Sequence, residues 1–451
     1  MNFVPDENQK RMIRHLTKGG RRKALFAQMG TGKTAATLDA ICEVISDTGG
    51  AALIVAPLNV CLLTWPGEIE LWDKFRWLKV ANLRTREGQI AWQQGSANIY
   101  LINWDSLPAF IRKTLAFHRK GDHCPANIVV YDELSKAKSH SSKRVNQWRR
   151  FTYLFDYHWG LTGTPNPNSY QDLFAQFRLL CGSSSPLGTA FGTFQKTYFE
   201  SLDWNQYKWQ LKPGRGEEIE EAIRPYVLSL GAGEFPIEYI DQEVPLSKET
   251  KAAYRELETK LLLELPNNEE ISAANSAVLV MKLLQMTSGA AYDSDRHAVG
   301  IHTEKIQALR ELKKKHHGEN LLVVTMFKHE RERLLAAFPD AVEFKKELLA
   351  DWNAGKIKML VIDPRSAGHG LNFQGPCHIA VWTTLTYSRE LYEQTNARLA
   401  RKGQKHTVLV YHLMCPNTVD WAVRSVLDAK GNQERGLLTA LKNIKKLHSS
   451  K

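Results

Sequence analysis

Residues 27–34 read Ala27-Gln28-Met29-Gly30-Thr31-Gly32-Lys33-Thr34, between an apolar strand at Ala24–Phe26 and a helix expected over Ala35–Ile45. The two glycines let backbone N–H groups gather around phosphate oxygens, while the amine of Lys33 reaches the β and γ phosphates. The hydroxyl of Thr34 is suited to hold Mg²⁺, and the positive end of the helix dipole adds to the attraction. The segment therefore predicts a loop that binds a nucleoside triphosphate with Mg²⁺.

Short apolar runs rich in β-branched residues recur along the chain, and a helix-like stretch follows each of them. This alternation predicts parallel sheets covered by helices on both faces, and the two separate series of runs predict two α/β lobes. The expected strands are Ala24–Ala27, Ala52–Ala56, Ile99–Asn103, Ile128–Tyr131 and His158–Thr162 in the first lobe, and Leu321–Thr325, Met359–Ile362, His378–Trp382 and Thr407–His412 in the second.

The segment Gly231-Ala232-Gly233 is the expected hinge between the lobes, because consecutive small residues interrupt regular structure. The N-terminal lobe is then residues 1–230 and the C-terminal lobe residues 231–451. Each lobe is expected to carry an insertion. The first, at about 185–228, is rich in aromatic and basic residues, and the second, at about 248–290, has helical periodicity.

Composition excludes several classes of protein. The chain has 451 residues, of which 43% are hydrophobic and 24% charged, as in a globular protein. It has neither a long apolar run for a membrane span nor the apolar core of a secretion signal, so we expect an intracellular protein. Its six cysteines are scattered without a C-x-x-C pair, which argues against a zinc site or a disulfide framework.

The formal net charge of +12 favours a polyanionic partner. Charge by itself is equally compatible with a solvated coat of lysine side chains. The motifs must decide between these interpretations.

Asp132-Glu133 directly follows the expected strand Ile128–Tyr131, where α/β sheets place residues that face ligands. We assign Asp132 to Mg²⁺ and Glu133 to polarisation of the attacking water. A solvated strand end is the alternative for the pair alone, and its position after a phosphate loop favours the catalytic interpretation. Leu161–Pro165, which reads L-T-G-T-P, suits a sensor of the γ-phosphate or a simple turn.

Gln394, Arg398 and Arg401 are spaced i, i+4 and i+7, so that on a helix they share one face. Guanidinium groups that reach across a cleft between the lobes would stabilise charge on the transferring phosphate. A basic helix facing solvent or DNA is the alternative. Ser366–Asn372 follows the strand Met359–Ile362 and either approaches a phosphate backbone or turns the chain.

Taken in their order along the chain, these segments resemble the motifs of superfamily-two helicase-like ATPases, and among these the Swi/Snf-type DNA translocases. The resemblance extends from about Phe3 to Ala429. The first half is similar to the family's Q motif and motifs I to III at Phe3–Leu16, Gly30–Thr34, Ala56–Val60, Ile102–Asp105, Asp132-Glu133 and Leu161–Pro165. The second half is similar to motifs IV, V and VI at Val323–Lys328, Ser366–Asn372 and Gln394–Gln404. Arg224–Leu228 and Pro236–Tyr254 resemble segments that are particular to the Swi/Snf group. The resemblance implies two RecA-like lobes.

The resemblance also implies the site residues. ATP would be bound by Gln9, Met29, Gly30, Thr31, Gly32, Lys33, Thr34 and Gly370, and Mg²⁺ by Thr34 and Asp132. Catalysis would fall to Glu133, Gln394, Arg398 and Arg401, and DNA contacts to Pro57, Asn59, Lys136, Lys138, Lys143, Arg144, Lys328, Ser366, Gly368 and Asn372. One departure is Ser135, which stands where the family has histidine and puts the coupling between motifs II and III in doubt.

Two further segments bear on DNA. Lys136–Arg144 is rich in lysine, arginine and serine, which suits sequence-independent phosphate contacts, with a solvated basic helix as the alternative. The aromatic side chains of Trp204–Trp209 could stack on bases, but packing within the insertion's own core is favoured.

The leading hypothesis is an ATP-dependent translocase on double-stranded DNA that moves along the duplex or remodels protein–DNA complexes. It is expected to act as a monomer in the cytoplasm of a bacterial or phage-infected cell. A strand-separating DNA or RNA helicase and an ATP-gated DNA-binding scaffold without turnover stay open.

Overall fold

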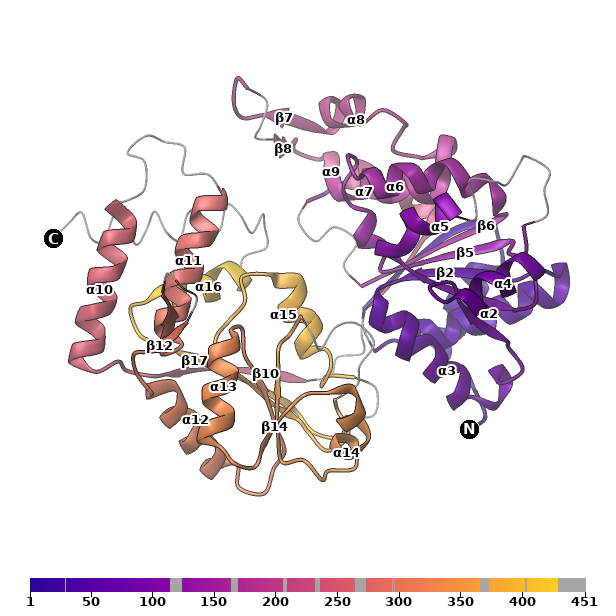
Figure 1. The fold of residues 1–451 in the computed structure, drawn as a ribbon. Coiled ribbons are helices and arrows are strands. Elements are labelled where there is room, and N and C mark those ends of the chain that lie inside the picture. The colour runs from indigo at the N-terminus through magenta and orange to yellow at the C-terminus, as the bar shows by residue number, and fades with distance from the viewer. Residues whose placement is uncertain are drawn as a thin grey trace. The chain divides into compact units, whose positions relative to one another are not determined.

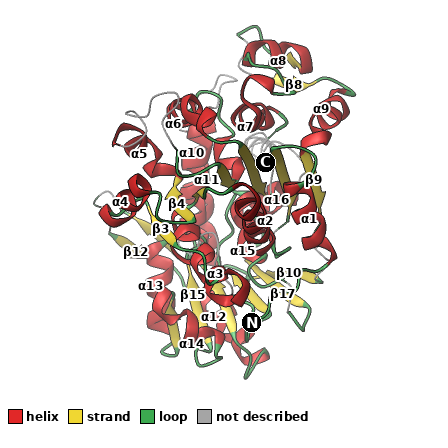
Figure 2. Cartoon of the chain, turned by 90° about the vertical axis from the view of Figure 1, so that its right-hand side faces the viewer, coloured by secondary structure: helices red, strands yellow, loops and turns green. Residues whose placement is uncertain are grey.

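The computed structural model describes residues 1–28, 30–113, 124–163, 169–205, 209–231, 236–263, 273–293, 295, 297–365, 373–401 and 404–428, and for residues 262–263, 273–277 and 346 only the backbone. The chain divides into two compact units, Met1–Gly233 and Glu234–Lys451. Each unit is built on one parallel sheet with helices on its faces (Figures 1 and 2). The predicted fold class is therefore confirmed.

The sheet of the first unit has seven strands in the order β3-β4-β2-β5-β6-β1-β9, and all its pairings are parallel. The strands are β1 Arg22–Ala27, β2 Ala52–Ala56, β3 Val80–Asn82, β4 Ile99–Asn103, β5 Ile128–Asp132, β6 Tyr157–Thr162 and β9 Val227–Leu230. The five predicted strands are all present within one or two residues of their expected ends. The two edge strands, β3 and β9, were not predicted.

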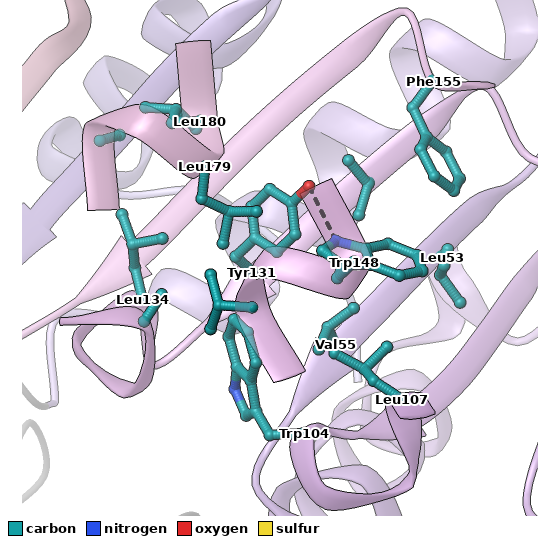
Figure 3. Packing of buried hydrophobic residues seen from close by; sticks show 14 of the residues in the cluster. Leu53, Val55, Trp104, Leu107, Tyr131, Leu134, Trp148, Phe155, Leu179 and Leu180 are labelled. Atoms are coloured by element: carbon teal, nitrogen blue, oxygen red, sulfur yellow. Dashed lines mark hydrogen bonds between the residues drawn. The ribbon is translucent and has the colours of Figure 1, made fainter. Parts of the chain in front are cut away.

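Helices cover both faces of this sheet because its central strands are apolar on both sides; every residue of β2 and β4 is buried. One face packs against α1 Glu7–Thr17, α2 Lys33–Thr48 and α3 Trp65–Leu71. The other packs against α4 Arg86–Gln94, α5 Leu107–Lys113, α6 Lys143–Trp148 and α7 Gln171–Cys181. On this second face the indole N–H of Trp148 donates to the hydroxyl of Tyr131 at 3.2 Å, which satisfies two polar groups inside the core (Figure 3).

A smaller part of the first unit follows α7. It consists of α8 Phe191–Tyr198, an antiparallel pair formed by β7 Phe199–Ser201 and β8 Trp209–Leu211, and α9 Arg215–Ile223. Trp209 is half-buried against the core, as the packing interpretation predicted. That interpretation is wrong for Trp204, which is 98% exposed because it lies beyond the end of β7, where no described residue covers it.

The sheet of the second unit has six strands in the order β10-β17-β16-β13-β15-β14, again all parallel. The strands are β10 Ile237–Glu243, β13 Leu321–Val324, β14 Ala341–Glu343, β15 Met359–Ile362, β16 Ile379–Trp382 and β17 Val408–Met414. The helices are α10 Lys248–Leu263, α11 Ala273–Thr287, α12 Glu304–Lys315, α13 Lys328–Ala337, α14 Leu349–Asn353, α15 Arg389–Asn396 and α16 Val419–Asp428. A hairpin of β11 Ala290–Tyr292 and β12 Ala298–Gly300 completes the unit.

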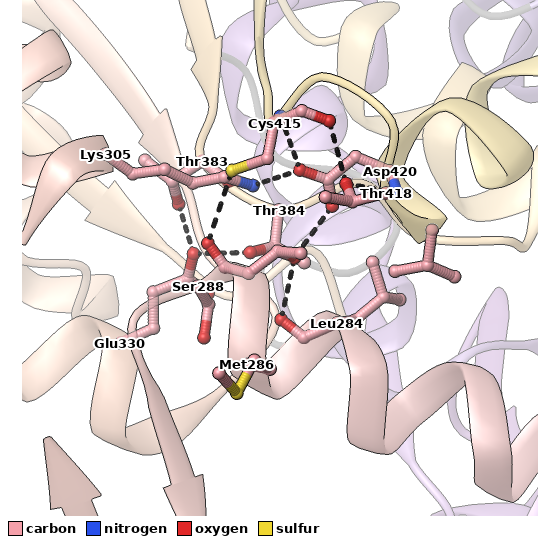
Figure 4. A network of polar contacts seen from close by, with 12 residues as sticks. Leu284, Met286, Ser288, Lys305, Glu330, Thr383, Thr384, Cys415, Thr418 and Asp420 are labelled. Atoms are coloured by element: carbon pink, nitrogen blue, oxygen red, sulfur yellow. Dashed lines mark hydrogen bonds and ion pairs between the residues drawn. The ribbon is translucent and has the colours of Figure 1, made fainter. Parts of the chain in front are cut away.

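A buried polar network ties the carboxyl ends of β16 and β17 to the surrounding helices (Figure 4). The amine of Lys305 lies 2.8 Å from Oδ2 of Asp420, and it also donates to the carbonyl of Thr383 at 2.8 Å. The carboxylate of Glu330 accepts hydrogen bonds from the hydroxyls of Thr383 and Thr384 at 2.6 and 2.7 Å. These contacts fix the loops that follow the strands of the second sheet.

Within the described residues, no helix combines the length and the apolar character that a membrane crossing requires.

Candidate nucleotide-binding and catalytic site

The predicted motifs of the first unit meet at one edge of its sheet. Because all the strands are parallel, the segments that follow β1, β2, β4, β5 and β6 emerge at the same edge. Four of these segments are the phosphate loop after β1, Pro57 after β2, Trp104 after β4 and Glu133 after β5. Only β6 separates the strand of the phosphate loop from the strand that ends with Asp132.

The phosphate loop has the backbone that its glycines predict. Gly30 and Gly32 have φ angles of 81° and 77°, in the left-handed region that favours glycine. Gly32 is the N-cap of α2, so the first N–H groups of that helix face the loop. A Cβ atom at Gly32 would overlap the side-chain amide of Gln9. Met29, which belongs to the predicted loop, lies outside the described residues.

Gln9 connects the first helix to this loop. Its Nε2 donates to the carbonyl of Gly32 at 3.5 Å, and its Oε1 accepts from the backbone N–H of Asp6 at 3.0 Å. The carboxylate of Asp6 in turn accepts from the backbone N–H of Gln9 at 2.8 Å, which completes a capping box at the start of α1. Gln9 is thereby held beside the phosphate loop, and its predicted role in ATP binding stays a prediction.

The amine of Lys33 lies at the loop itself. It donates to the carbonyl of Ala27 and, at 3.0 Å, to the carbonyl of Gln28. The hydroxyl of Thr31 donates to the same carbonyl of Gln28 at 2.8 Å. The loop therefore closes around its own lysine, which places a positive charge at the N-terminal end of α2.

Asp132 is held by two tryptophans and by its neighbour. Its Oδ2 accepts from the indole N–H of Trp65 at 2.9 Å, and its Oδ1 accepts from the backbone N–H of Glu133 at 3.0 Å. Its carbonyl accepts from the indole N–H of Trp104 at 3.0 Å. Both indoles are buried, so the orientation of the Asp132 carboxylate is fixed by the core.

The pKa of Asp132 is raised to about 6, first by burial of the carboxylate and second by the negative charge of Glu133. The hydrogen bond from Trp65 and the positive charge of Lys33 lower it in part. Asp132 is therefore a carboxylate whose charge its surroundings do not fully compensate. One such carboxylate together with the hydroxyl of Thr34 fits Mg²⁺, which prefers oxygen ligands and retains several waters.

Glu133 has an unusual backbone conformation. Its φ angle is +57°, which costs a residue with a Cβ atom on the order of 1–3 kcal/mol and is typical of functional sites. Its side chain accepts a hydrogen bond from the hydroxyl of Ser135 at 3.1 Å, and both residues are buried. The serine at the position where the resemblance predicts histidine thus orients the Glu133 carboxylate, whose catalytic role stays a prediction. Thr164 and Pro165 lie outside the described residues, so the coupling to motif III stays an open prediction.

Gln394, Arg398 and Arg401 were predicted to share one face of a helix. This prediction is wrong for Arg398 and Arg401, which lie beyond the end of the helix. The helix α15 ends at Asn396, and the next residues form tight turns in which the N–H of Arg398 bonds to the carbonyl of Thr395 at 3.1 Å. Two tertiary contacts stabilise this ending. The indole of Trp382 donates to Oδ1 of Asn396 at 2.9 Å, and the Gln404 side-chain amide donates to the carbonyls of Leu399 and Cys377 at 3.2 and 3.0 Å.

The three side chains nevertheless lie within one short segment of the second unit. Gln394 is buried and donates from Nε2 to Glu390 at 3.3 Å, and Arg398 is only 2% exposed. Arg401 is half-buried, and its Nε donates to the carbonyl of Ala397 at 2.7 Å. Their catalytic role stays a prediction.

The residues predicted to contact DNA differ in how exposed their side chains are. Pro57 and Asn59 are half-buried after β2. Lys136, Lys143 and Lys328 are exposed, whereas Lys138 and Arg144 are half-buried. The segment 136–144 is not one helix, because a 3-10 turn at Leu134–Ala137 and α6 are separated by a loop. Ser366, Gly368, Gly370 and Asn372 lie outside the described residues.

Arg144 already has local partners. It pairs with the carboxylate of Asp105, and its guanidinium lies over the ring of Trp104 at 5.9 Å. Residue types alone gave no sign of the contacts that Trp65, Trp104 and Ser135 make around Asp132 and Glu133.

Comparison with known proteins agrees with this geometry. A family model described as the SNF2-related domain matches residues 9–230. The chain is 32% identical over 466 residues to protein p41 of Acyrthosiphon pisum secondary endosymbiont phage 1, covering 98% of this chain and 99% of p41. It is 22% identical to an uncharacterized ATP-dependent helicase, MG018 of Mycoplasma genitalium, covering 90% of this chain but 39% of that longer protein.

Among solved structures, the helicase domain of Hef from Pyrococcus furiosus superposes with a TM-score of 0.52 at 13% identity, covering 93% of this chain and 97% of that one. This likeness shows a common fold of two RecA-like lobes. Together with the family match, it confirms the resemblance found in the sequence. The chain therefore belongs to the SNF2-related family of helicase-like ATPases.

Proposed function

We propose that this chain hydrolyses ATP with Mg²⁺ and uses the energy to move along double-stranded DNA or to remodel protein–DNA complexes. The observation that carries the proposal is the meeting of the phosphate loop and Asp132-Glu133 at one sheet edge, where the charge of Lys33 is close enough to lower the pKa of Asp132. Phosphoryl transfer needs these parts together: a cation at the phosphates, a carboxylate for Mg²⁺ and a second carboxylate for water.

Each residue around the phosphate loop and the end of β5 then has a proposed role. Lys33 and the N–H groups at the start of α2 bind the phosphates, and Gln9 recognises the base. Thr34 and Asp132 would hold Mg²⁺, which supplies charge neutralisation at the β and γ phosphates. Glu133 accepts a hydrogen bond from the water whose oxygen attacks the γ-phosphorus as the bond to the β-phosphate oxygen breaks.

We assign Gln394, Arg398 and Arg401 of the second unit to the transferring phosphate, where a guanidinium stabilises the charge of the transition state. Pro57, Asn59 and the basic side chains of Lys136, Lys138 and Lys143 are assigned to the DNA backbone. Contacts of this kind do not read sequence. The similarity to a phage protein favours a bacterial or phage-infected cytoplasm, and we propose that the chain acts as a monomer.

The test is the rate of ATP hydrolysis by the full chain with and without duplex DNA, over a series of salt concentrations. We expect stimulation by duplex that falls steeply as salt rises, because phosphate contacts release counterions. Lys33→Ala should abolish hydrolysis, and Glu133→Gln should lose hydrolysis but retain ATP binding. Equal turnover with and without duplex contradicts the proposal.

Two controls separate the alternatives. Stronger stimulation by single strands or RNA, together with unwinding of a labelled duplex, would indicate a strand-separating helicase. Displacement of a triplex-forming strand without unwinding supports translocation. If Glu133→Gln and the natural chain have the same negligible turnover but both bind DNA in response to ATP, the protein is an ATP-gated scaffold.

A further inference from the structure

The second unit contains a cavity of about 530 Å³ that the proposed reaction does not use. It is lined by the end of α12 and by the segments that lead into β13, β14 and β15, including Gly318, Pro339 and Lys358. Because these strands are parallel, the cavity lies at the amino-terminal edge of the sheet. The segments that resemble motifs IV and V follow the opposite, carboxyl-terminal edge.

The lining of this cavity is strongly basic. Its permanently charged cations are Arg310, Lys313, Lys314 and Lys358, and its carboxylates are Glu319 and Asp340. Four positive and two negative charges in the lining leave an excess of two positive charges with the neighbouring histidines neutral, or of one when Glu311, which pairs with Lys314, is counted as well. Like charges gathered around a small volume repel one another, so an anionic ligand would be stabilised there.

The cations of the lining differ in whether a nearby carboxylate neutralises their positive charge. Lys313 pairs with Asp340, and Lys314 lies 2.9 Å from a carboxylate oxygen of Glu311. Arg310 instead lies over the ring of Phe338 at 5.8 Å, and no carboxylate among the described residues pairs with it.

Lys358 is the second cation without a carboxylate partner in the described part of the chain. Its amine donates to the carbonyl of Gly318 at 3.1 Å and to Oδ1 of Asn320 at 3.3 Å. Both of these acceptors are neutral. Arg310 and Lys358 therefore carry the uncompensated charge of the cavity.

The helix dipole does not account for this arrangement. Lys313, Lys314 and Lys315 occupy the last turn of α12, where cations favour the negative end of a helix. Arg310 precedes that turn, and Lys358 comes from the separate segment before β15. Two segments far apart in the sequence thus bring uncompensated cations to one cavity.

We propose that this cavity is a second binding site, for a compact ligand with two or more phosphate groups. A guanidinium offers paired N–H donors that match phosphate oxygens, and the lysine amine adds a point charge. The volume is in the range of small-ligand sites. Phe338 is only 4% exposed, so it offers no face on which a base could stack, and recognition is by the phosphates. The same chemistry is presented by a free oligophosphate and by the backbone of a nucleic acid.

The test is calorimetric titration of the full chain with inorganic tripolyphosphate, in a Lys33→Ala background that removes the lysine of the proposed ATP site. The variant Arg310→Ser/Lys358→Ser should bind tripolyphosphate at least about tenfold more weakly than its parent. The matched control is Lys251→Ser/Lys345→Ser, which removes the same charge from exposed positions of the same unit outside the cavity. It should bind like the parent.

No binding by the parent, or equal weakening in both double variants, overturns the proposal. A short duplex that displaces tripolyphosphate from the parent would assign the cavity to a nucleic-acid backbone, and retention of tripolyphosphate would assign it to a free oligophosphate. Melting curves of both variants verify that each remains folded. The inference is independent of the proposed function, because ATP hydrolysis in the absence of DNA by Arg310→Ser/Lys358→Ser with intact Lys33 should equal that of the natural chain.

Discussion

The hydroxyl of Ser135 donates a hydrogen bond of 3.1 Å to Oε1 of Glu133, two residues before it in the chain. Serine stands here where the related ATPases have histidine. The bond holds a buried carboxylate whose backbone is already constrained to a left-handed conformation. We infer that the serine keeps Glu133 in position for the attacking water, so that the substitution changes the support of the carboxylate but retains its function.

Removal of this hydroxyl should slow hydrolysis while ATP binding is unchanged. A hydrogen bond to a charged group contributes roughly 1.5 kcal/mol, so Ser135→Ala should lower kcat about tenfold. The control is Ser139→Ala, an exposed serine of the same segment whose hydroxyl bonds only to Ser141 among the described residues. Steady-state kinetics with saturating duplex measure both variants. An unchanged kcat in Ser135→Ala would show that Glu133 needs no such support.

The indole of Trp65 should set the acidic limit of activity. Its hydrogen bond to Asp132 stabilises the ionised carboxylate and keeps the pKa, which burial raises, from rising above its value of about 6. Trp65→Phe removes the donor, so the pKa should rise. Since Mg²⁺ requires ionised Asp132, the acidic limb of the profile of kcat/KM against pH should move to higher pH.

Trp72→Phe is the matched control, because the Trp72 indole makes the same kind of bond, at 2.7 Å, to Glu68. It should leave the acidic limb in place. Coincident profiles for the natural chain and Trp65→Phe would mean that Asp132 does not govern the limb.

The sequence was sufficient to predict the strands at the centre of each sheet but not those at the edges. Central strands such as β2 are buried on both faces and read as continuous apolar runs. The edge strand β10 has no fully buried residue, does not alternate strictly between half-buried and exposed residues, and is rich in acids, so its sequence resembles a loop. The end of α15 was missed for a different reason. It depends on contacts from Trp382 and Gln404, which no local pattern reveals.

The candidate site likewise contains some residues that could be predicted from the sequence and others that could not. Lys33, Asp132 and Glu133 could be predicted because phosphate chemistry restricts which residues can follow strands at such an edge. Their supports, Trp65 and Ser135, could not, since a tryptophan or serine serves many roles and only the fold decides which carboxylate it meets.

A methyl group at Gly32 should disrupt the phosphate loop specifically. Gly32→Ala introduces a Cβ atom that overlaps the amide of Gln9, at a φ angle of 77°. We expect the affinity for ATP to fall at least about tenfold, an effect of roughly 1.4 kcal/mol. The control is Gly49→Ala at the other end of the same helix, where φ is 71° and nothing lies within 4 Å of the added atom.

Gly32→Ala should lose about 1 kcal/mol of stability from its left-handed backbone, and Gly49→Ala should lose more, because its ψ angle of −170° places it in a region nearly restricted to glycine. Only Gly32→Ala should lose ATP binding, as measured by titration with a fluorescent nucleotide. Equal affinities in the two variants would show that the contact with Gln9 is unimportant for binding.

Arg401→Ala should separate binding from hydrolysis. If Arg401 acts on the transferring phosphate, its loss should leave ATP binding nearly intact but lower kcat by on the order of 10³-fold, as for other arginine fingers. Arg389→Ala is the control, because Arg389 lies on α15 and pairs with Glu393 at 2.6 Å. Normal hydrolysis by Arg401→Ala would remove Arg401 from the proposed mechanism.

The buried pair of Lys305 and Asp420 should make a large contribution to the stability of the second unit. Their side chains are 4% and 2% exposed. Burial is the largest single effect on the pKa of Lys305 and lowers it, but the charge and hydrogen bond of Asp420, together with Cys415 and Glu330, raise this pKa overall. Lys305→Met would leave Asp420 buried with neutral hydrogen-bond donors, among them Thr287 and the Cys415 backbone at 2.8 and 2.9 Å. An unpaired buried charge costs about 3–5 kcal/mol.

Denaturant unfolding should therefore show a loss of this size for Lys305→Met, whereas Lys305→Met/Asp420→Leu should recover part of it because no charge is left unpaired. The exposed pair of Lys314 and Glu311 provides the comparison, since Lys314→Met should cost less than about 1 kcal/mol. If Lys305→Met were as mild as Lys314→Met, water or another cation would have to reach Asp420, and the network around β16 and β17 would not be closed to solvent.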